Sequence, residues 1–95
     1  KWDETRFIDG YPGKYIIMAR RSGEKWYVVG LNALKEPLKL TLDLPMFAGK
    51  EFSVYCDKPL KKNQKFAEAE MKPGKLNKKG LLKVVIQPNG GLIVN

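Results

Sequence analysis

Between positions 38 and 44, apolar and polar residues alternate strictly, and this spacing constrains the fold more than any other feature. The apolar positions are Leu38, Leu40, Leu42 and Leu44, and the polar positions between them are Lys39, Thr41 and Asp43. Successive side chains of a β-strand point to opposite faces, so the leucines share one face and the polar residues share the other. The segment therefore predicts a strand with one face in a core and the other in water.

Strand-like segments of similar length occupy the rest of the chain. Ser22-Gly23-Glu24 is a short glycine-bearing link, which predicts that residues 14–21 and 25–32 pair as an antiparallel hairpin. Turn residues recur at roughly the 8–12-residue spacing of all-β domains, and no segment of about 11 residues has a helical period. The expected strands are residues 3–8, 14–21, 25–32, 38–44, 50–57, 66–71, 81–87 and 92–94.

The expected turns complete the sequence-based fold. Asp9-Gly10 and Pro12-Gly13 are turn-forming pairs that close the first strand, and residues 88–91 turn the chain into the last one. A chain of 95 residues has room for one domain. We expect residues 1–95 to form a single antiparallel β-sandwich of about eight strands with Greek-key character. Strand-like residues follow directly after Lys1, so we also expect the domain to be a segment of a longer polypeptide.

Positive charge is concentrated in one part of the chain. The net charge is +8, but residues 1–57 hold 9 basic and 8 acidic side chains, whereas residues 58–83 hold 9 lysines and 2 glutamates. We interpret the lysines as a solvated sheet edge, because edge lysines discourage strand-to-strand aggregation. Nucleic-acid binding is the alternative, but this stretch has no arginine and one aromatic residue, Phe66, so we expect no nucleic-acid partner.

The residues that usually carry catalysis are missing or isolated. The chain has no histidine, and its one cysteine, Cys56, has no candidate base and fits a small buried strand residue. Glu68 and Glu70 share a strand face, but the lysines around them favour charge balancing over an acid–base pair. No glycine-rich phosphate loop or calcium-loop spacing occurs. We expect no catalytic, cofactor or metal site, and no apolar run approaches the ~20 residues of a membrane span, so we expect no membrane partner.

Aromatic side chains are the remaining candidates for a binding role. Trp26 and Tyr27 are neighbours, so they must lie on opposite sides of their strand, and one of them can pack on a neighbouring domain or a ligand. Exposed rings of this kind also stack on sugars, which leaves a saccharide-binding platform as an alternative. The candidate residues at a domain seam or ligand surface are Trp2, Tyr11 and Trp26.

Several motifs in order resemble the C-terminal domain of glycoside hydrolase family 97, a family of bacterial α-glucosidases and α-galactosidases of the Bacteroides type. The matching segments are residues 2–6 (Trp-Asp-Glu-Thr-Arg), 13–21, 23–30, 40–44 (Leu-Thr-Leu-Asp-Leu) and 88–91 (Pro-Asn-Gly-Gly). Residues 57–62 depart from the family, which usually has a glycine- and asparagine-bearing loop there. Leu92 also stands where an aromatic residue is common.

The resemblance implies a function for the domain. Such enzymes have an N-terminal β-sandwich, a catalytic (β/α)8 barrel and a small C-terminal β-sandwich, and this chain is similar to the third part. The catalytic carboxylates and the calcium ligands would then lie in the other domains, and this chain alone would not be an enzyme. It would pack on the barrel of the same polypeptide, supporting its stability or homo-oligomerisation, in a periplasmic or otherwise exported protein. A carbohydrate-binding module is the alternative.

Overall fold

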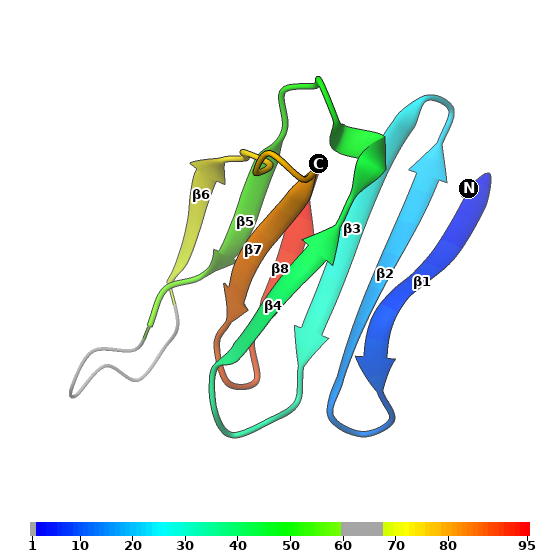
Figure 1. Cartoon of the computed structure of the whole chain (residues 1–95). Helices are drawn as coiled ribbons and strands as arrows, with labels where there is room; N and C mark the ends of the chain where they lie inside the picture. Colours follow the sequence, from blue (N-terminus) through cyan, green and yellow to red (C-terminus); the bar gives the residue numbers. More distant parts are fainter. Residues whose placement is uncertain (1, 60–67) are drawn as a thin grey trace.

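Eight antiparallel strands in two layers make up the computed structural model, which describes residues 2–59 and 68–95 (Figure 1). The prediction of an all-β sandwich of about eight strands is confirmed. A 3-10 turn, η1, lies at Pro45–Phe47. The strands are β1 (Glu4–Tyr11), β2 (Tyr15–Ser22), β3 (Lys25–Asn32), β4 (Leu38–Asp43), β5 (Ser53–Asp57), β6 (Ala69–Pro73), β7 (Leu81–Ile86) and β8 (Gly91–Val94).

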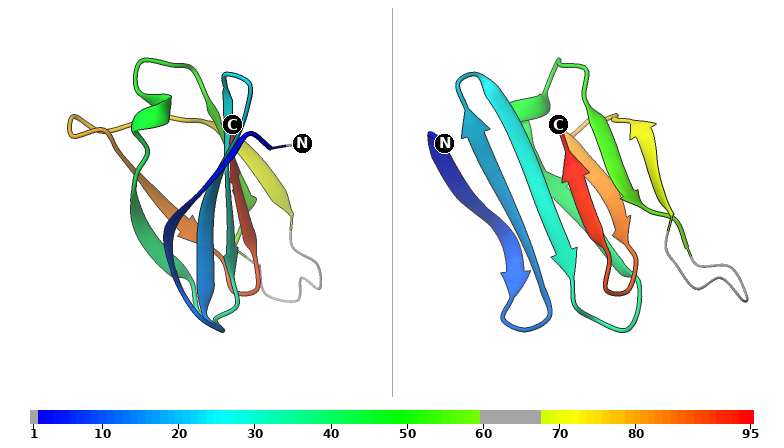
Figure 2. Two further views of the ribbon diagram at one scale, coloured as in Figure 1. Left: turned by 90° about the vertical axis from the view of Figure 1, so that its right-hand side faces the viewer. Right: turned by 180° about the vertical axis from the view of Figure 1, so that it is seen from behind.

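The two layers differ in size. Six strands form one sheet in the order β1-β2-β3-β8-β5-β6, and β4 pairs with β7 in a two-stranded sheet. The chain passes between the sheets four times, so β8 lies between β3 and β5 although these are far apart in sequence. These crossings give the fold its Greek-key character. The smaller sheet lies across the middle of the larger one and leaves β1 and β6 extending beyond it (Figures 1 and 2).

The core lies between the two sheets. Leu42 is 2% exposed and Leu44 is fully buried, while Leu38 and Leu40 pack against the same cluster, so the predicted leucine face is confirmed. The larger sheet contributes alternate residues from its central strands. Its buried apolar side chains are Ile17, Ala19, Val28, Val54, Leu92 and Val94.

One buried polar side chain ties the layers together. Asn32, at the end of β3, is 2% exposed. Its Nδ2 donates hydrogen bonds to the carbonyl oxygens of Ile86 (2.9 Å) and Glu36 (3.0 Å), and its Oδ1 accepts one from the Leu34 amide (2.9 Å). The bond to Ile86 links the larger sheet directly to β7. A buried amide with these partners avoids the cost of an unsatisfied polar group.

Local predictions near the first turn were partly wrong. Residues Asp9-Gly10 lie inside β1, which continues to Tyr11, and the register against β2 shifts between Phe7 and Asp9. A β-bulge of this kind accommodates an extra residue without ending the strand. The Pro12-Gly13 turn is confirmed, because Gly13 has a φ of 73° and the Lys14 amide donates to the Tyr11 carbonyl at 3.0 Å.

The hairpin between β2 and β3 is confirmed, whereas two other strands have different bounds. Ser22 pairs with Lys25, and Gly23 has a φ of 63°, which suits the first loop position of a two-residue hairpin. The expected strand 50–57 begins only at Ser53, although Phe52, Val54 and Cys56 do share the core-facing side. Part of the expected strand 66–71 lies outside the described residues, and β6 continues to Pro73 at the sheet edge.

No helix within the described ranges is long and apolar enough to cross a membrane.

Candidate interaction surface

The outward face of the six-stranded sheet carries an apolar row that crosses every strand. The strand register places its members directly opposite one another, from β1 through β2, β3, β8 and β5 to β6. Side chains opposite each other on one face of a sheet are in contact range. The row consists of Phe7, Met18, Val29, Ile93, Tyr55 and Met71.

Solvent reaches most of this row. Phe7 is 65% exposed, Met71 is 58% exposed and Ile93 is 45% exposed. Ile16 and Leu31 form a neighbouring pair on the same side and are also exposed. We call these eight residues the apolar sheet face: Phe7, Ile16, Met18, Val29, Leu31, Tyr55, Met71 and Ile93. Contiguous exposed apolar surface of this kind marks interaction sites on folded proteins.

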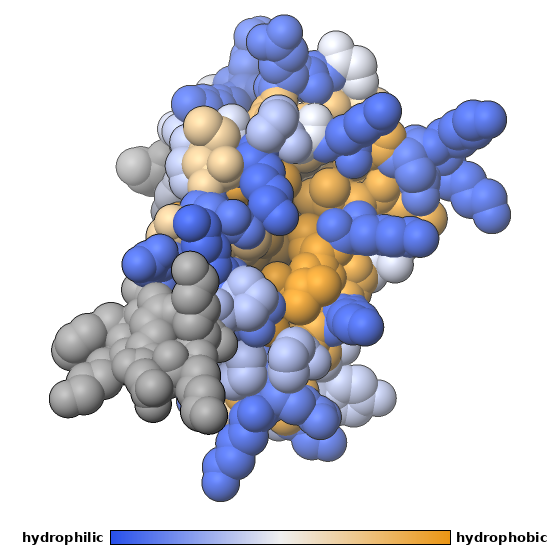
Figure 3. All heavy atoms as spheres, turned by 90° about the vertical axis from the view of Figure 1, so that its left-hand side faces the viewer, coloured by the Kyte–Doolittle hydropathy of each residue, from blue (hydrophilic) through white to orange (hydrophobic). Residues whose placement is uncertain are grey.

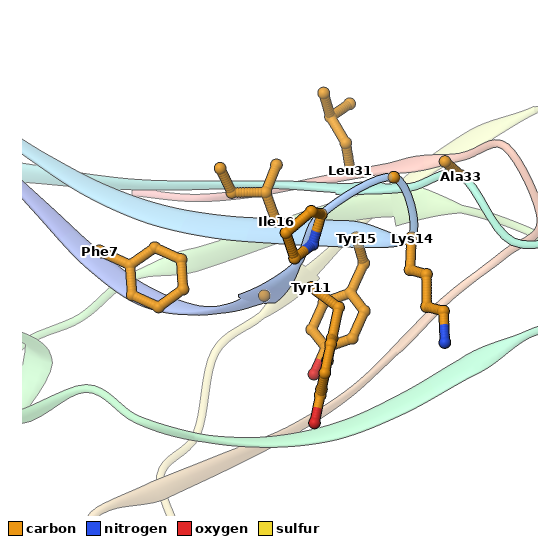
Figure 4. A pocket seen from close by; sticks show the side chains of 10 residues that line it. Phe7, Tyr11, Lys14, Tyr15, Ile16, Leu31 and Ala33 are labelled. Atoms are coloured by element: carbon orange, nitrogen blue, oxygen red, sulfur yellow. The ribbon is translucent and has the colours of Figure 1, made fainter.

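A groove of about 510 Å³ lies at one end of the apolar sheet face. Phe7, Ile16 and Leu31 line it together with the turn that joins β1 to β2 (Figure 4). Gly10 is required there, because a Cβ atom would lie 2.8 Å from the Tyr15 carbonyl oxygen and 3.3 Å from the Phe7 ring. The absent side chain leaves a concave apolar end that can receive a protruding side chain from a partner.

Trp2 extends the apolar sheet face at its opposite end. Its ring packs edge-on against Tyr27, with the ring centroids 5.3 Å apart, and the guanidinium of Arg20 lies 5.6 Å from its centroid. Arg20 and Tyr27 are paired in the register and point away from the core. Trp2 is 43% exposed. An amphipathic ring beside a cation is a frequent component of protein interfaces.

The structure places the three sequence-predicted aromatics in different surroundings. Trp2 lies on the outward side of the larger sheet, whereas Trp26 lies on the inward side and packs against the core. Tyr11 is exposed beside Tyr15 at the far end of β1, with the ring centroids 6.2 Å apart (Figure 4). The opposite orientations predicted for Trp26 and Tyr27 are confirmed. No common platform holds Trp2, Tyr11 and Trp26.

Trp26 is surrounded by charges where β1 and β2 extend beyond the smaller sheet. The guanidinium of Arg6 lies 4.9 Å from its ring centroid and that of Arg21 lies 6.0 Å away. Glu4 forms ion pairs with both arginines. The hydrogen bond from Arg6 lowers the pKa of Glu4 below its usual value. Desolvation acts in the opposite direction, and the hydrogen bond from Arg21 lowers the pKa further. These contacts hold the strand end, and the cluster keeps one net positive charge, because one carboxylate faces two guanidinium groups.

The smaller sheet presents a contrasting surface. Its outward positions on β4 are Lys39, Thr41 and Asp43, opposite Val85, Lys83 and Leu81 of β7.

Lysines surround the β6 edge of the larger sheet, where Lys72 pairs with Glu70 at 3.2 Å and Lys58 approaches Glu68 at 3.9 Å. Seen from the β6 side, hydrophilic side chains surround an apolar centre (Figure 3). The edge position predicted for this lysine-rich region is confirmed for β6, while Lys61, Lys62 and Lys65 lie outside the described residues.

Groups that could support catalysis are scattered. Cys56 is a half-buried free thiol, and burial, reinforced by Glu70, raises its pKa above the usual value, which disfavours the reactive thiolate. Within residues 2–59 and 68–95, no group of three or more metal-ligating side chains is close enough to hold an ion.

Sequence reasoning did not identify the apolar sheet face, although a signal for it was present. Residues 16–18 are apolar on both faces of β2, and Val28-Val29 repeats this on β3. Consecutive apolar residues in an antiparallel strand indicate burial on both sides. The row across six strands depends on the strand order, which local patterns do not specify.

Three comparisons with known proteins agree with one another. The model of a family described as glycosyl-hydrolase 97 C-terminal, oligomerisation, matches residues 1–95. The chain is 30% identical over 91 residues to a retaining alpha-galactosidase of Bacteroides thetaiotaomicron, covering 95% of this chain and 14% of that protein. It also matches a crystal structure of a beta-arabinopyranosidase with a TM-score of 0.83 and 49% identity, covering 99% of this chain and 14% of the other. The chain thus spans a small part of the length of these relatives.

Proposed function

Because this chain belongs to the glycosyl-hydrolase 97 C-terminal, oligomerisation family, we propose that it is a non-catalytic association module of a larger glycoside hydrolase. The module packs on the catalytic barrel of the same polypeptide and supports the stability or the oligomeric state of the enzyme. The observation that carries this proposal is the apolar sheet face, which crosses all six strands of the larger sheet and is exposed in the chain alone.

The chemistry of the described residues supports the non-catalytic part of the proposal. Glu4, Glu68 and Glu70 are each engaged by a basic neighbour. General acid–base catalysis by carboxylates needs two such groups converging on a substrate, with their pKa values separated by their surroundings. Substrate choice and bond cleavage then belong to the rest of the hydrolase, whose relatives include an alpha-galactosidase and a beta-arabinopyranosidase.

The test places charge on the apolar sheet face in the full-length polypeptide. Val29→Lys combined with Ile93→Lys puts two ammonium groups at the centre of the row, and Thr41→Lys puts one on the outward face of β4 as a control. We expect the double variant to lower the melting temperature of the full-length protein and to leave kcat per folded active site unchanged. A loss of kcat without a change in melting temperature would contradict an association role.

A further inference from the structure

One edge of the smaller sheet has no neighbouring strand in the part of the chain that the structure describes. β7 pairs with β4 on one side, and its other side lies toward β6, which extends beyond the smaller sheet (Figure 1). Among the described residues outside β4, hydrogen bonds reach the β7 backbone at its two ends. The Asn77 amide donates to the Leu81 carbonyl at 2.9 Å, and Asn32 Nδ2 donates to the Ile86 carbonyl at 2.9 Å. A free sheet edge offers its N–H and C=O groups to another strand, and the length of β7 makes this edge about 20 Å long.

A cleft of about 450 Å³ lies beside the β7 edge. Val54 and Cys56 of β5, whose side chains face inward, line it on the larger sheet, and Val84 and Val85 line it on β7. Seen from this side, an apolar surface is visible between hydrophilic side chains (Figure 3). Clefts that bind ligands have volumes of about 300–1,000 Å³. A strand added about 4.8 Å beyond β7 would lie over Val54 and Cys56 and place alternate side chains in the cleft.

The two ends of the larger sheet differ in the size of their inward side chains. On the β1 side, the large side chains of Ile8, Tyr15 and Trp26 pack against the core. On the β6 side, the inward residues of β5 are the smaller Val54 and Cys56. The smaller side chains leave space beside β7 for a further strand.

The carboxylates that line the cleft already have partners. Glu70 pairs with Lys72 at 3.2 Å, and both side chains line the cleft from β6. Asp57 Oδ2 accepts a hydrogen bond from the Gly91 amide at 3.2 Å. These contacts satisfy the acidic groups within the fold, so they do not compete for the lysines that lie nearer to β7.

Two of those lysines have no carboxylate at ion-pair distance among the described residues. Lys83 is exposed on β7 itself and lines the cleft, and Lys75, from the connection between β6 and β7, lines a smaller hollow together with Lys83. A second copy of this edge carries the same ammonium groups and is repelled, whereas a strand with carboxylates at alternate positions is attracted. The lysines that discourage self-pairing therefore also select the partner.

We propose that the β7 edge and its cleft bind an extended segment of a partner protein in which apolar and acidic residues alternate. The segment joins the smaller sheet as a third strand, with its apolar side chains over Val54 and Cys56 and its carboxylates beside Lys75 and Lys83. In this mode of recognition, main-chain hydrogen bonds supply affinity and the alternating side chains supply specificity. The cleft lies on the inward side of the larger sheet, so this function goes beyond the association role of the apolar sheet face and does not depend on it.

The test measures binding of a synthetic peptide to the full-length polypeptide by fluorescence anisotropy. The probe is a labelled peptide as long as β7 in which valine and glutamate alternate, and the comparison peptide has lysine in place of glutamate. We expect saturable binding of the glutamate peptide and much weaker binding of the lysine peptide. Lys75→Glu combined with Lys83→Glu should weaken binding of the glutamate peptide about tenfold, because two attractions become repulsions. Lys25→Glu combined with Lys35→Glu makes the same change in net charge away from the cleft and should leave binding unchanged.

Two further readouts separate strand addition from attraction between charges alone. N-methylation of alternate residues in the glutamate peptide removes N–H donors without changing its charge, and it should abolish binding. Hydrogen exchange in residues 81–86 should slow when the glutamate peptide is bound, while exchange in residues 4–11, the edge strand at the other end of the molecule, should not change.

Three results would overturn the inference. Equal binding of the N-methylated peptide or unchanged exchange in residues 81–86 would rule out an added strand. No saturable binding of the glutamate peptide would mean that the edge is closed in the full-length polypeptide, by another part of it or by a second copy. None of these results involves the apolar sheet face, so each would leave the proposed function in place.

Discussion

The two outward faces of the sandwich differ in how much apolar surface they present. On the β4–β7 sheet, the leucines of β4 point inward and Lys39, Thr41 and Asp43 point to solvent, while Val85 of β7 is an exposed apolar side chain among them. On the six-stranded sheet, the inward side is buried and the outward side still carries Phe7 and Ile93 among its exposed apolar residues. An antiparallel sheet with one face in water normally alternates in the first manner. The difference indicates that the larger sheet is built to be covered on both sides.

Substitutions of inward side chains in either sheet should lower the free energy of unfolding more than substitutions of outward ones. Leu42→Ala removes a side chain that is 2% exposed and should lower the free energy of unfolding by about 2–5 kcal/mol. Thr41→Ala, one residue away and outward, should change it by no more than about 0.5 kcal/mol. Urea unfolding of the 95-residue chain measures both. Similar losses for the two variants would mean that the outward face of β4 is not simply solvated.

Two glycines in adjacent strands give a second contrast across the larger sheet. A Cβ on Gly30 would lie 2.7 Å from Ile17 Cδ1 and 3.2 Å from Ile86 Cδ1, so Gly30→Ala overfills the core. We expect it to cost about 1–3 kcal/mol of unfolding free energy. Gly91→Ala points outward, where the nearest atom would be 3.4 Å away, and should cost less. An equal or larger loss for Gly91→Ala in thermal unfolding would show that the outward side is as tightly filled as the core.

The strand pattern and the face of each leucine followed from the sequence, because side-chain alternation is a local property. The bulge between Phe7 and Asp9 was missed, since Asp-Gly is a strong turn signal and its side-chain hydrogen bond to the Gly10 amide forms equally well in a strand. The apolar sheet face was missed for a different reason. Val29, Ile93 and Tyr55 become neighbours only when β8 inserts between β3 and β5, a tertiary event that no local signal encodes.

Charge on the apolar sheet face should alter association more than stability in the isolated chain. Val29 and Ile93 are 40% and 45% exposed, so Val29→Lys with Ile93→Lys removes little buried contact and should change the unfolding free energy by less than about 1 kcal/mol. The same change should reduce concentration-dependent self-association in sedimentation velocity, because exposed apolar patches promote it. Thr41→Lys should leave both properties unchanged. If the double variant self-associates as strongly as the wild-type chain, the surface that drives self-association lies elsewhere.

The smallest effect concerns the half-buried carboxylate of Glu4 at the start of β1. Arg6 and Arg21 lower the pKa of Glu4, so the stabilisation from this carboxylate is present above its unfolded pKa and is lost as the pH falls through the lower folded pKa. Glu4→Gln should therefore reduce the melting temperature slightly at neutral pH and leave it nearly unchanged well below pH 4. If the difference in melting temperature between Glu4→Gln and the wild-type chain grows as the pH falls, the lowered pKa of Glu4 is contradicted.

Solvent access to the apolar sheet face tests the central claim most directly. Ile93→Cys in a Cys56→Ala background places one thiol of this chain at the centre of the row, and Thr41→Cys in the same background provides the control on β4. Thiol labelling rates are compared between the 95-residue chain and the full-length polypeptide. The account predicts that position 93 reacts much more slowly in the full-length protein, whereas position 41 reacts at similar rates in both. Equal rates at position 93 in the two proteins would contradict it.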